Sequence, residues 1–468
     1  MGGYFQILGK LMTFGLLAFF VYRTFLKSDK PAALVLMLGL MIILEDYLQK
    51  AIYIPGLKVG SVRFSEIFIV YLLIKDYRKK QRYEKYESKT IDSLWIPFIL
   101  LFLISVFVSH HKFIAARNFR FCILDPFLVY LIACHGFDNE DDYKRFAIYL
   151  GVLVFLLAAA SIDDLKFHRI WFRGPMRIKY EFFGKEFKGR YGSFFLNPNF
   201  FASFLVLSLP IVFTSILYFK RREKYISLFS LLAGILALIL TWTRSVYVAF
   251  AAGVLFSSYY GLLKVVNFRK IVLLLFMIIG LVGAVFPGAM NKIFYRASTT
   301  IEEQIGDSKV EHSRLEIWRH ALELLKRHPF IGIGLTETDY RLSARHEIGG
   351  GYVYKKGARR SVSGFGDQPH NSYISLALWV SPFSVIIFLM MNYRVLKLGR
   401  NVIKNPDAQA YYKLFSFSAG VAIFCYLVVI FFDTQLLVRT VNSLYWLLFG
   451  LLISVYRRVE SEKTILTA

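Results

Sequence analysis

Three residues in the second half of the chain have side chains suited to chemistry on a charged substrate. Arg244 lies in a short polar turn, 241–245, between two stretches of almost continuous apolar residues. Arg314 lies within a long polar segment, and His370 stands where that segment meets the next apolar stretch. Arginine is always charged and can bond phosphate oxygens through two N–H groups at once. A neutral imidazole can accept a hydroxyl proton near pH 7. These residue types favour a site for an anionic substrate.

Each arginine also has an ordinary structural interpretation. Arg244 could extend its charged end to the membrane surface beside Trp242, because an arginine inside an apolar stretch is costly without an anionic partner. Arg314 could lie on a solvated helix face and form an ion pair with Glu311, three residues earlier. Such a pair stabilises a helix by only a few tenths of a kcal/mol. The sequence alone leaves both interpretations open for both residues.

His370 has a structural interpretation as well. A single histidine at the start of a helix is more often structural than catalytic, and either Asn371 or Ser372 could cap the helix that follows. The position at a membrane boundary, beside basic groups, favours a role as proton acceptor.

The segment that begins with Ser313 predicts an amphipathic helix. Four apolar residues recur at helical spacing and predict one apolar stripe: Leu315, Trp318, Leu322 and Leu325. The basic residues Arg314, Arg319 and Lys326 lie off that stripe, and His328-Pro329 predicts the end of the helix. Such a helix in an outer loop would lie on the membrane surface or roof a pocket.

We expect neither a metal nor a cofactor. The three cysteines, Cys122, Cys134 and Cys425, lie in apolar stretches without metal-ligand spacing. The pair Asp163-Asp164 has no third carboxylate nearby and is typical of a solvated helix end. The sequence Gly-Ile-Gly at 332–334 lacks the strand and the third glycine of a dinucleotide site. We expect no nucleic-acid partner either.

The composition excludes an ordinary soluble protein. Of the 468 residues, 56% are hydrophobic and 17% are aromatic, and the mean hydropathy is +0.49. No single core could absorb so much apolar side chain. We therefore predict an all-α fold, a polytopic membrane protein with about twelve to thirteen transmembrane helices and a long, partly helical outer loop. The predicted spans are 5–26, 31–48, 62–77, 92–109, 113–135, 143–162, 195–219, 224–243, 245–263, 269–288, 371–394, 411–433 and 439–457.

The short basic loops predict the orientation. Lysine and arginine collect in cytoplasmic loops, and here they collect at 75–82, 220–224, 269–270, 394–404 and 457–458. The two long polar segments then face outward, and both are basic, part of a formal net charge of +25. The resulting division is 1–162 N-terminal transmembrane helices, 163–194 first outer loop, 195–288 further transmembrane helices, 289–370 large outer loop, and 371–468 C-terminal transmembrane helices.

Four short segments, in order along the chain, resemble the O-antigen ligase and Wzy-type polymerase superfamily. They read GRYGSFFLNPN at 189–199, TRS at 243–245, RLEIW at 314–318 followed by HPFIGIG at 328–334, and PHNSY at 369–373. Each segment is short, and their order and separation carry the resemblance. The N-terminal third of the chain is similar only in being helical.

The resemblance implies a metal-independent, inverting membrane glycosyltransferase of the GT-C type. Its donor would be a glycan on undecaprenyl pyrophosphate at the outer face of a bacterial plasma membrane, and its acceptor a hydroxyl of another glycan or of a lipid A core. Arg244 and Arg314 match the arginines thought to hold the pyrophosphate, and His370 matches the histidine thought to activate or orient the acceptor. We expect four further residues to bind the pyrophosphate or the glycan: Arg319, Arg190, Asn199 and Asn371.

Two alternatives remain open. A Wzy-type polymerase would share the fold and mechanism and differ in its acceptor, another lipid-linked chain. A transporter or flippase of an anionic lipid-linked glycan would need charged residues facing a central cavity, and the main candidates are Glu45, Asp46, Arg120 and Asp125. The single long outer segment late in the chain favours the enzyme, and its content of both Arg314 and His370 favours the ligase.

Overall fold

The computed structural model describes most of the chain. The described residues are 15, 18–42, 63–80, 89–135, 137, 139–166, 177–181, 188–195, 197–260, 314–348, 351–355, 358–362 and 368–467. The predicted span 269–288, and Glu45 and Asp46, lie outside these residues.

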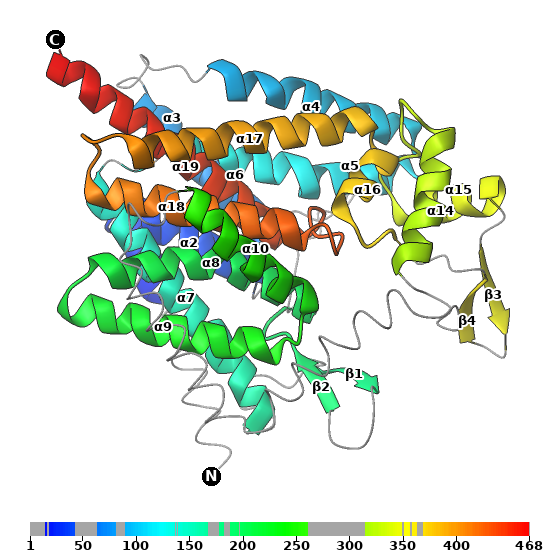
Figure 1. Cartoon of the computed structure of the whole chain (residues 1–468), viewed down its shortest axis with the longest axis horizontal. Helices are drawn as coiled ribbons and strands as arrows, with labels where there is room; N and C mark the ends of the chain where they lie inside the picture. The colour runs from blue at the N-terminus through cyan, green and yellow to red at the C-terminus, as the bar shows by residue number, and fades with distance from the viewer. Residues whose placement is uncertain are drawn as a thin grey trace.

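The described part of the chain is largely helical (Figure 1). Its first half contains α2 (Lys30–Leu40), α3 (Phe64–Lys80), α4 (Lys89–Val108), α5 (Lys112–Phe119), the π-helical turn η2 (Arg120–Leu124), α6 (Asp125–Cys134), α7 (Glu140–Lys166), α8 (Pro198–Tyr218), α9 (Arg221–Leu240) and α10 (Arg244–Tyr260). Its second half contains α14 (Arg314–Arg327), α15 (Glu337–Ile348), α16 (Ser372–Trp379), α17 (Pro382–Lys404), α18 (Ala410–Val429) and α19 (Arg439–Thr467). The prediction of a largely helical fold is confirmed, and the long polar segment 289–370 is helical in part, at α14 and α15.

Five of the described helices are long and apolar enough to cross a membrane. They are Glu140–Ser161, Pro198–Tyr218, Arg222–Leu240, Pro382–Lys404 and Ala410–Val429. Four of them coincide with predicted spans, whereas Pro382–Lys404 overlaps only the second half of the predicted span 371–394. The total of twelve or thirteen stays a prediction. The protein is an integral membrane protein with its longest apolar helices packed side by side (Figure 1).

The prediction of one continuous helix over 371–394 is wrong. The helix α16 ends at Trp379, and α17 begins at Pro382. Ser381 is fully extended, and its side-chain oxygen accepts a hydrogen bond from the Phe383 N–H as the N-cap of α17. Proline is well suited to the first position of a helix, where no N–H donor is needed, so the sequence Ser-Pro starts a new helix here. The break exposes backbone groups that a polar segment uses, as described below.

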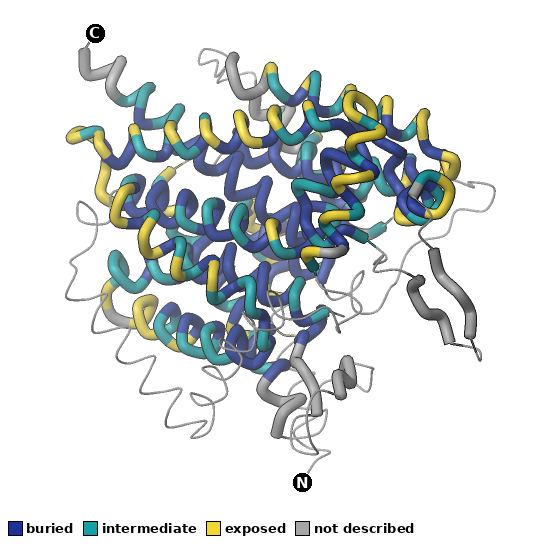
Figure 2. Tube along the Cα trace, turned by 45° about the vertical axis from the view of Figure 1, so that its right-hand side comes forward, coloured by how far each residue is buried: buried dark blue, intermediate teal, exposed yellow. Residues whose placement is uncertain are grey.

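Helices α8, α18 and α19 lie in the buried middle of the bundle, and α9 and α17 lie nearer its surface (Figure 2). The helix α19 packs closely on α6. A Cβ atom at Gly450 would stand 2.8 Å from the Tyr130 carbonyl oxygen, so only a glycine allows this approach. The three cysteines are buried and free, as expected for small apolar side chains.

The described parts of the two long polar segments gather at one end of the bundle (Figure 1). The first forms an antiparallel hairpin of β1 (Arg177–Glu181) and β2 (Lys188–Tyr191). The second contains α14, α15 and a hairpin of β3 (Gly351–Lys355) and β4 (Ala358–Val362). The hairpins were not predicted, because neither segment shows a clear alternation of apolar and polar residues. We call this end of the bundle the polar end.

A buried ion-pair network joins three helices near the polar end. Arg439, at the start of α19, lies 2.5 Å from the Asp125 carboxylate and 3.6 Å from that of Glu66. Arg120 lies 3.1 Å from Glu66 and packs over the ring of Phe121. Two of the charges named for the transporter alternative, Arg120 and Asp125, therefore take part in ion pairs that hold helices together.

Candidate functional site

Asp433 is the centre of a polar cluster at the polar end, in the loop between α18 and α19. One carboxylate oxygen accepts hydrogen bonds from Asn199 Nδ2 at 3.0 Å and from Gln435 Nε2 at 3.2 Å. The other accepts the Thr434 N–H at 2.8 Å and faces His370 Nδ1 at 3.5 Å. The Asp433 side chain is 9% exposed and that of His370 is 39% exposed. A buried carboxylate therefore lies behind an imidazole that remains accessible.

Three short turns bring the polar groups together, and each contains a non-glycine residue in the left-handed region. These residues are Ser193 with φ 53°, Trp242 with φ 50° and His370 with φ 49°. They immediately precede the segments that start α8, α10 and α16. Left-handed non-glycine residues cost free energy and persist where the surroundings determine them, often at functional sites. The three turns correspond to three of the four segments that carry the family resemblance.

Asn199 links two of these turns to the Asp433 loop. Its side-chain oxygen accepts a hydrogen bond from Thr243 Oγ1 at 3.2 Å, and its backbone oxygen accepts one from Gln435 Nε2 at 3.2 Å. Asn197 caps α8 by accepting the Asn199 N–H at 2.8 Å. Because Thr243 precedes Arg244, this chain of hydrogen bonds fixes the start of α10 relative to Asp433.

Arg314 approaches the same cluster from α14. The indole of Trp318, one turn further along that helix, donates to the Pro369 carbonyl at 3.0 Å, directly before His370. The Trp318 ring also packs edge-on against Phe431, with centroids 5.2 Å apart. The helix α14 is thereby attached to both segments that carry the His370 and Asp433 pair.

The charges of the site perturb one another. Burial is the largest influence on Arg314 and lowers its pKa; the charge of Asp433 opposes this, and the charge of Arg244 adds to it. An arginine nevertheless remains protonated in proteins. Asp433 differs. Burial alone would raise its pKa, but the hydrogen bond and charge of His370 lower it by more, together with hydrogen bonds from Gln435 and the Thr434 N–H. Arg244, Arg314, His370 and Asp433 thus lie within electrostatic reach of one another.

The lowered pKa of Asp433 predicts a pH-dependent contribution to stability. The ionised carboxylate stabilises the folded protein above the usual aspartate pKa of about 3.9, and this contribution is lost as the pH falls through the lower pKa of the folded state. We expect the difference in Tm between the wild type and Asp433→Asn to be largest above about pH 5 and to narrow below about pH 4. Thermal unfolding in detergent at each pH checks this, and a difference that widens on acidification would contradict it.

A second set of contacts attaches the far end of α14 to the membrane helices. The backbone N–H groups of Gly332, Ile333 and Gly334 donate to the carbonyls of residues 378–380 at 2.9 to 3.2 Å, where the break between α16 and α17 exposes them. Asp339 is fully buried and accepts Ser109 Oγ at 2.5 Å, the His110 N–H at 3.0 Å and Thr336 Oγ1 at 2.6 Å. The HPFIGIG sequence therefore serves to dock the polar segment on α4, α16 and α17.

Gly334 of this docking segment has neither the backbone conformation nor the space for a side chain. Its φ is 112°, and a Cβ atom there would stand 2.6 Å from Asp339 Oδ2 and 2.8 Å from Ser109 Cα. We expect Gly334→Ala to destabilise the protein by about 1–3 kcal/mol through backbone strain and overpacking. Thermal unfolding in detergent measures the loss. Gly39→Ala on α2 is the control, since its Cβ would meet only Leu153 Cδ1 at 4.0 Å.

The other predicted site residues are distributed around this cluster. Arg319 is exposed on α14. Asn371 is 1% exposed and caps α16, because its side-chain oxygen accepts the N–H groups of Tyr373 and Ile374. Arg190 lies on β2, opposite Ile178, where the structure describes the backbone.

The predicted apolar stripe of α14 is partly wrong. The buried face consists of Ile317, Ala321 and Leu324, whereas Leu315 is 52% exposed and Leu322 is 45% exposed. On so short a helix, apolar residues at helical spacing can be assigned to either of two adjacent faces. Which face is buried depends on the helices that α14 packs against. The predicted end of the helix is confirmed, since α14 ends at Arg327, directly before His328-Pro329.

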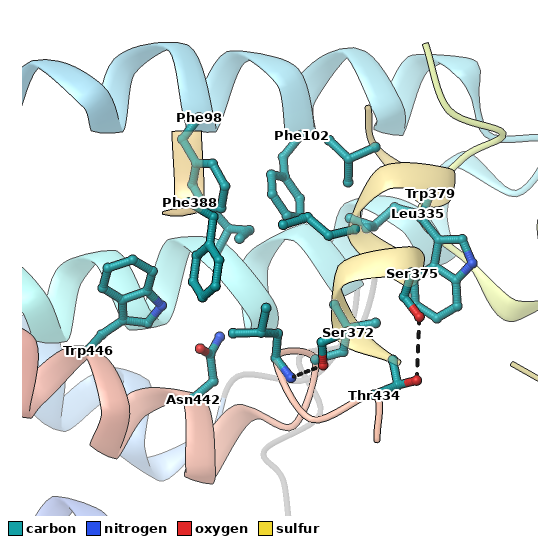
Figure 3. A pocket seen from close by; sticks show the side chains of 15 residues that line it. Phe98, Phe102, Leu335, Ser372, Ser375, Trp379, Phe388, Thr434, Asn442 and Trp446 are labelled. Atoms are coloured by element: carbon teal, nitrogen blue, oxygen red, sulfur yellow. Dashed lines mark hydrogen bonds between the residues drawn. The ribbon is translucent and has the colours of Figure 1, made fainter. Parts of the chain in front are cut away.

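A small cavity lies beside the cluster, beneath the residues that follow His370 and Asp433 (Figure 3). Most of its wall is apolar, and five aromatic side chains from four helices contribute to it: Phe98, Phe102, Trp379, Phe388 and Trp446. On its polar edge, Ser372 Oγ accepts the Gln435 N–H at 3.0 Å and Ser375 contacts Thr434 at 3.4 Å. The cavity separates the polar cluster from the apolar middle of the bundle.

The family model for the O-antigen ligase matches residues 229–380. This part of the chain is similar to the O-antigen ligase family. The matched O-antigen ligase domain begins within α9, ends in the break after α16, and contains Arg244, Arg314 and His370. The chain matches no curated protein. The family assignment therefore covers about a third of the chain, including the three residues first singled out for chemistry.

Asn199 and Asp433 lie outside the matched O-antigen ligase domain, yet the fold brings them against His370. Sequence reasoning did not identify Asp433. A signal existed, because Asp433, Thr434 and Gln435 are three consecutive polar residues between two apolar stretches, and an ionisable residue there indicates function. The residue was assigned to the end of a membrane span instead.

Proposed function

We propose that the protein is a membrane glycosyltransferase of the O-antigen ligase type. It would transfer a glycan from undecaprenyl pyrophosphate to an acceptor hydroxyl at the outer face of a bacterial plasma membrane, with inversion and without a metal ion. The observation that supports this most strongly is the position of the His370 and Asp433 pair within electrostatic reach of Arg314, whose pKa in turn responds to Arg244. A base and two permanent cations at one site fit the displacement of a pyrophosphate.

The reaction needs one bond made and one broken. The acceptor oxygen attacks the anomeric carbon of the donor glycan, and the bond from that carbon to the phosphate oxygen breaks on the opposite face. The pyrophosphate leaves with the bonding electron pair, and the acceptor proton passes to the base. Attack opposite the leaving group inverts the anomeric configuration. The lipid product is undecaprenyl pyrophosphate.

His370 is the proposed base. Its Nδ1 faces the Asp433 carboxylate at 3.5 Å, which leaves Nε2 for the acceptor hydroxyl. Asp433 would fix the orientation of the ring and stabilise the imidazolium that forms as the proton arrives. The hydrogen bonds from Asn199 and Gln435 hold the carboxylate in place while this happens. A positioned base of this kind contributes about 10² to 10⁴ in rate.

Arg314 and Arg244 are the proposed ligands of the pyrophosphate. Charge accumulates on the phosphate oxygens as the glycosidic bond breaks, and fixed cations in a partly buried site stabilise that charge without reorganising. Burial is the main cause of the lowered pKa of Arg314, and the charge of Arg244 adds a smaller repulsion. An anionic substrate would relieve this repulsion when it binds.

One assay tests the proposal and separates its branches. The purified protein in detergent, with EDTA present, is incubated with an undecaprenyl-pyrophosphate-linked oligosaccharide, alone and with a lipid A core acceptor, and products are resolved by gel and mass spectrometry. We expect a single transfer that requires the core. A ladder from the donor alone would identify a polymerase instead. Donor binding without any product, weakened by Arg244→Ala, would contradict the enzyme and favour a transporter.

A further inference from the structure

The outward face of α14 carries a pattern that the proposed reaction does not use. Four exposed residues at spacings of four, three and four follow one another along the helix: Leu315, Arg319, Leu322 and Lys326. The two leucines are 52% and 45% exposed, on a helix whose other face is buried against its neighbours. Leucine beside arginine and lysine on one open face is typical of helices that lie in a membrane interface.

The charge on this face is mainly positive. Among the α14 residues whose exposure the structure describes, Arg319, Lys326 and Arg327 stand against one exposed acid, Glu323. Basic residues next to a bilayer are attracted to anionic lipid headgroups. Their long side chains can also cover apolar surface while the charge stays in water.

The apolar part of this face continues into the surface of a membrane helix. Past the end of α14, Phe330 is 67% exposed and Ile331 is 52% exposed. Phe330 stacks on Phe383, with ring centroids 6.5 Å apart, at the first turn of α17. From Phe383 an exposed apolar stripe descends α17 through Ile386, Leu389 and Tyr393, as expected of a helix that faces lipid. Phe330 therefore lies where the lipid-facing surface ends.

The direction of α14 agrees with an interfacial position. The membrane helices run along one axis, and α14 crosses their ends (Figure 1). A helix in this direction, level with the first turn of a membrane span, lies at the depth of the lipid headgroups.

We propose that Leu315, Arg319, Leu322 and Lys326 form an interfacial docking surface for the anionic phospholipids of the surrounding bilayer. The leucines would enter the boundary between headgroups and acyl chains, and the basic side chains would contact the phosphates. Docking would hold Arg314, on the same helix, at the depth at which a membrane-anchored phosphate lies. Because lipid contact needs no donor, the proposal can be tested apart from the proposed glycosyl transfer.

The test uses an environment-sensitive fluorophore at Leu322→Cys. The three native cysteines are buried, so the introduced thiol can be labelled selectively with a nitrobenzoxadiazole dye. The labelled protein is placed in nanodiscs of phosphatidylglycerol or of phosphatidylcholine, without donor. We expect the emission to be blue-shifted and brighter in phosphatidylglycerol than in phosphatidylcholine. The same label at Arg345→Cys, exposed on α15, is the control and should give the same spectrum in both lipids.

A charge-reversed variant tests the electrostatic part. We expect the double variant Arg319→Glu, Lys326→Glu, with the dye at position 322, to give the same emission spectrum in both lipids. Raising the salt from 0.1 M to 1 M shortens the screening length from about 10 Å to about 3 Å and should reduce the difference in the unreversed protein. Identical spectra in the two lipids, or a difference that survives charge reversal, would overturn the proposal.

Discussion

Alanine in place of His370 is expected to lower kcat by about 10² to 10⁴, with a much smaller effect on donor binding. The proton of the acceptor hydroxyl would lose its acceptor, while the arginines proposed to hold the pyrophosphate remain. Initial rates of glycan transfer at saturating donor measure the loss, and a binding titration with unreactive donor measures the affinity. His135→Ala is a control, since His135 lies directly after the end of α6 and its ring contacts the Leu131 carbonyl.

The Asp433→Asn variant separates the base from its orienting partner. The asparagine amide has nearly the shape of the aspartate carboxylate, and its oxygen can still accept the hydrogen bond from Asn199. It has no charge, however, with which to stabilise the imidazolium of His370. We expect a reduced kcat whose pH dependence is displaced relative to that of the wild type. A His370→Ala enzyme with wild-type kcat would remove His370 from the mechanism, and an unchanged pH profile in Asp433→Asn would remove Asp433.

The second large effect is expected at Arg314. Losing one preorganised donor to a developing anion commonly costs about 3–4 kcal/mol, or about 10² to 10³ in rate. Arg314→Ala should therefore lower kcat by this factor. Arg314→Lys should recover part of it, because lysine restores the charge but not the two-pronged contact with phosphate. Arg327→Ala is the matched control, an exposed arginine at the last position of the same helix.

Folding controls accompany these rates. Arg314 is half-buried, and burial, with a smaller contribution from the charge of Arg244, outweighs the attraction to Asp433 and disfavours its charged form. Removing this side chain should therefore leave the Tm close to that of the wild type or slightly above it. A variant that loses activity together with several degrees of Tm would indicate a structural role. Wild-type rates in a folded Arg314→Ala protein would contradict the assignment of Arg314 to the pyrophosphate.

Much of the helical framework could be predicted, because runs of about twenty apolar residues have few alternatives in a membrane. The first residues of four helices lie within a few residues of the first residues of the predicted spans: α8, α10, α16 and α19. Helix caps could be predicted as well, as Asn371 shows. The break at Ser381-Pro382 was missed because apolar residues on both sides concealed a cap and an N1 proline.

The site was predictable only in part, for a physical reason. Arg244, Arg314 and His370 were chosen because their side chains suit the chemistry and their segments resemble a family. The pairing of His370 with Asp433 joins residues 63 positions apart, and the contact between Asn199 and Asp433 joins residues 234 positions apart. Local patterns contain no information on such contacts. The buried face of α14 likewise depends on which helix it meets, so Leu315 and Leu322 were assigned to the wrong face.

The most direct test of the account is the stoichiometry between glycan transferred and undecaprenyl pyrophosphate released. Wild-type protein, donor and acceptor are mixed with EDTA present, and both products are quantified by mass spectrometry over one turnover, beside His370→Ala. The account predicts one undecaprenyl pyrophosphate for each glycosidic bond in the wild type, and bound donor with almost no release in the variant. Donor that binds the wild type without releasing pyrophosphate, or equal release by both proteins, would contradict it.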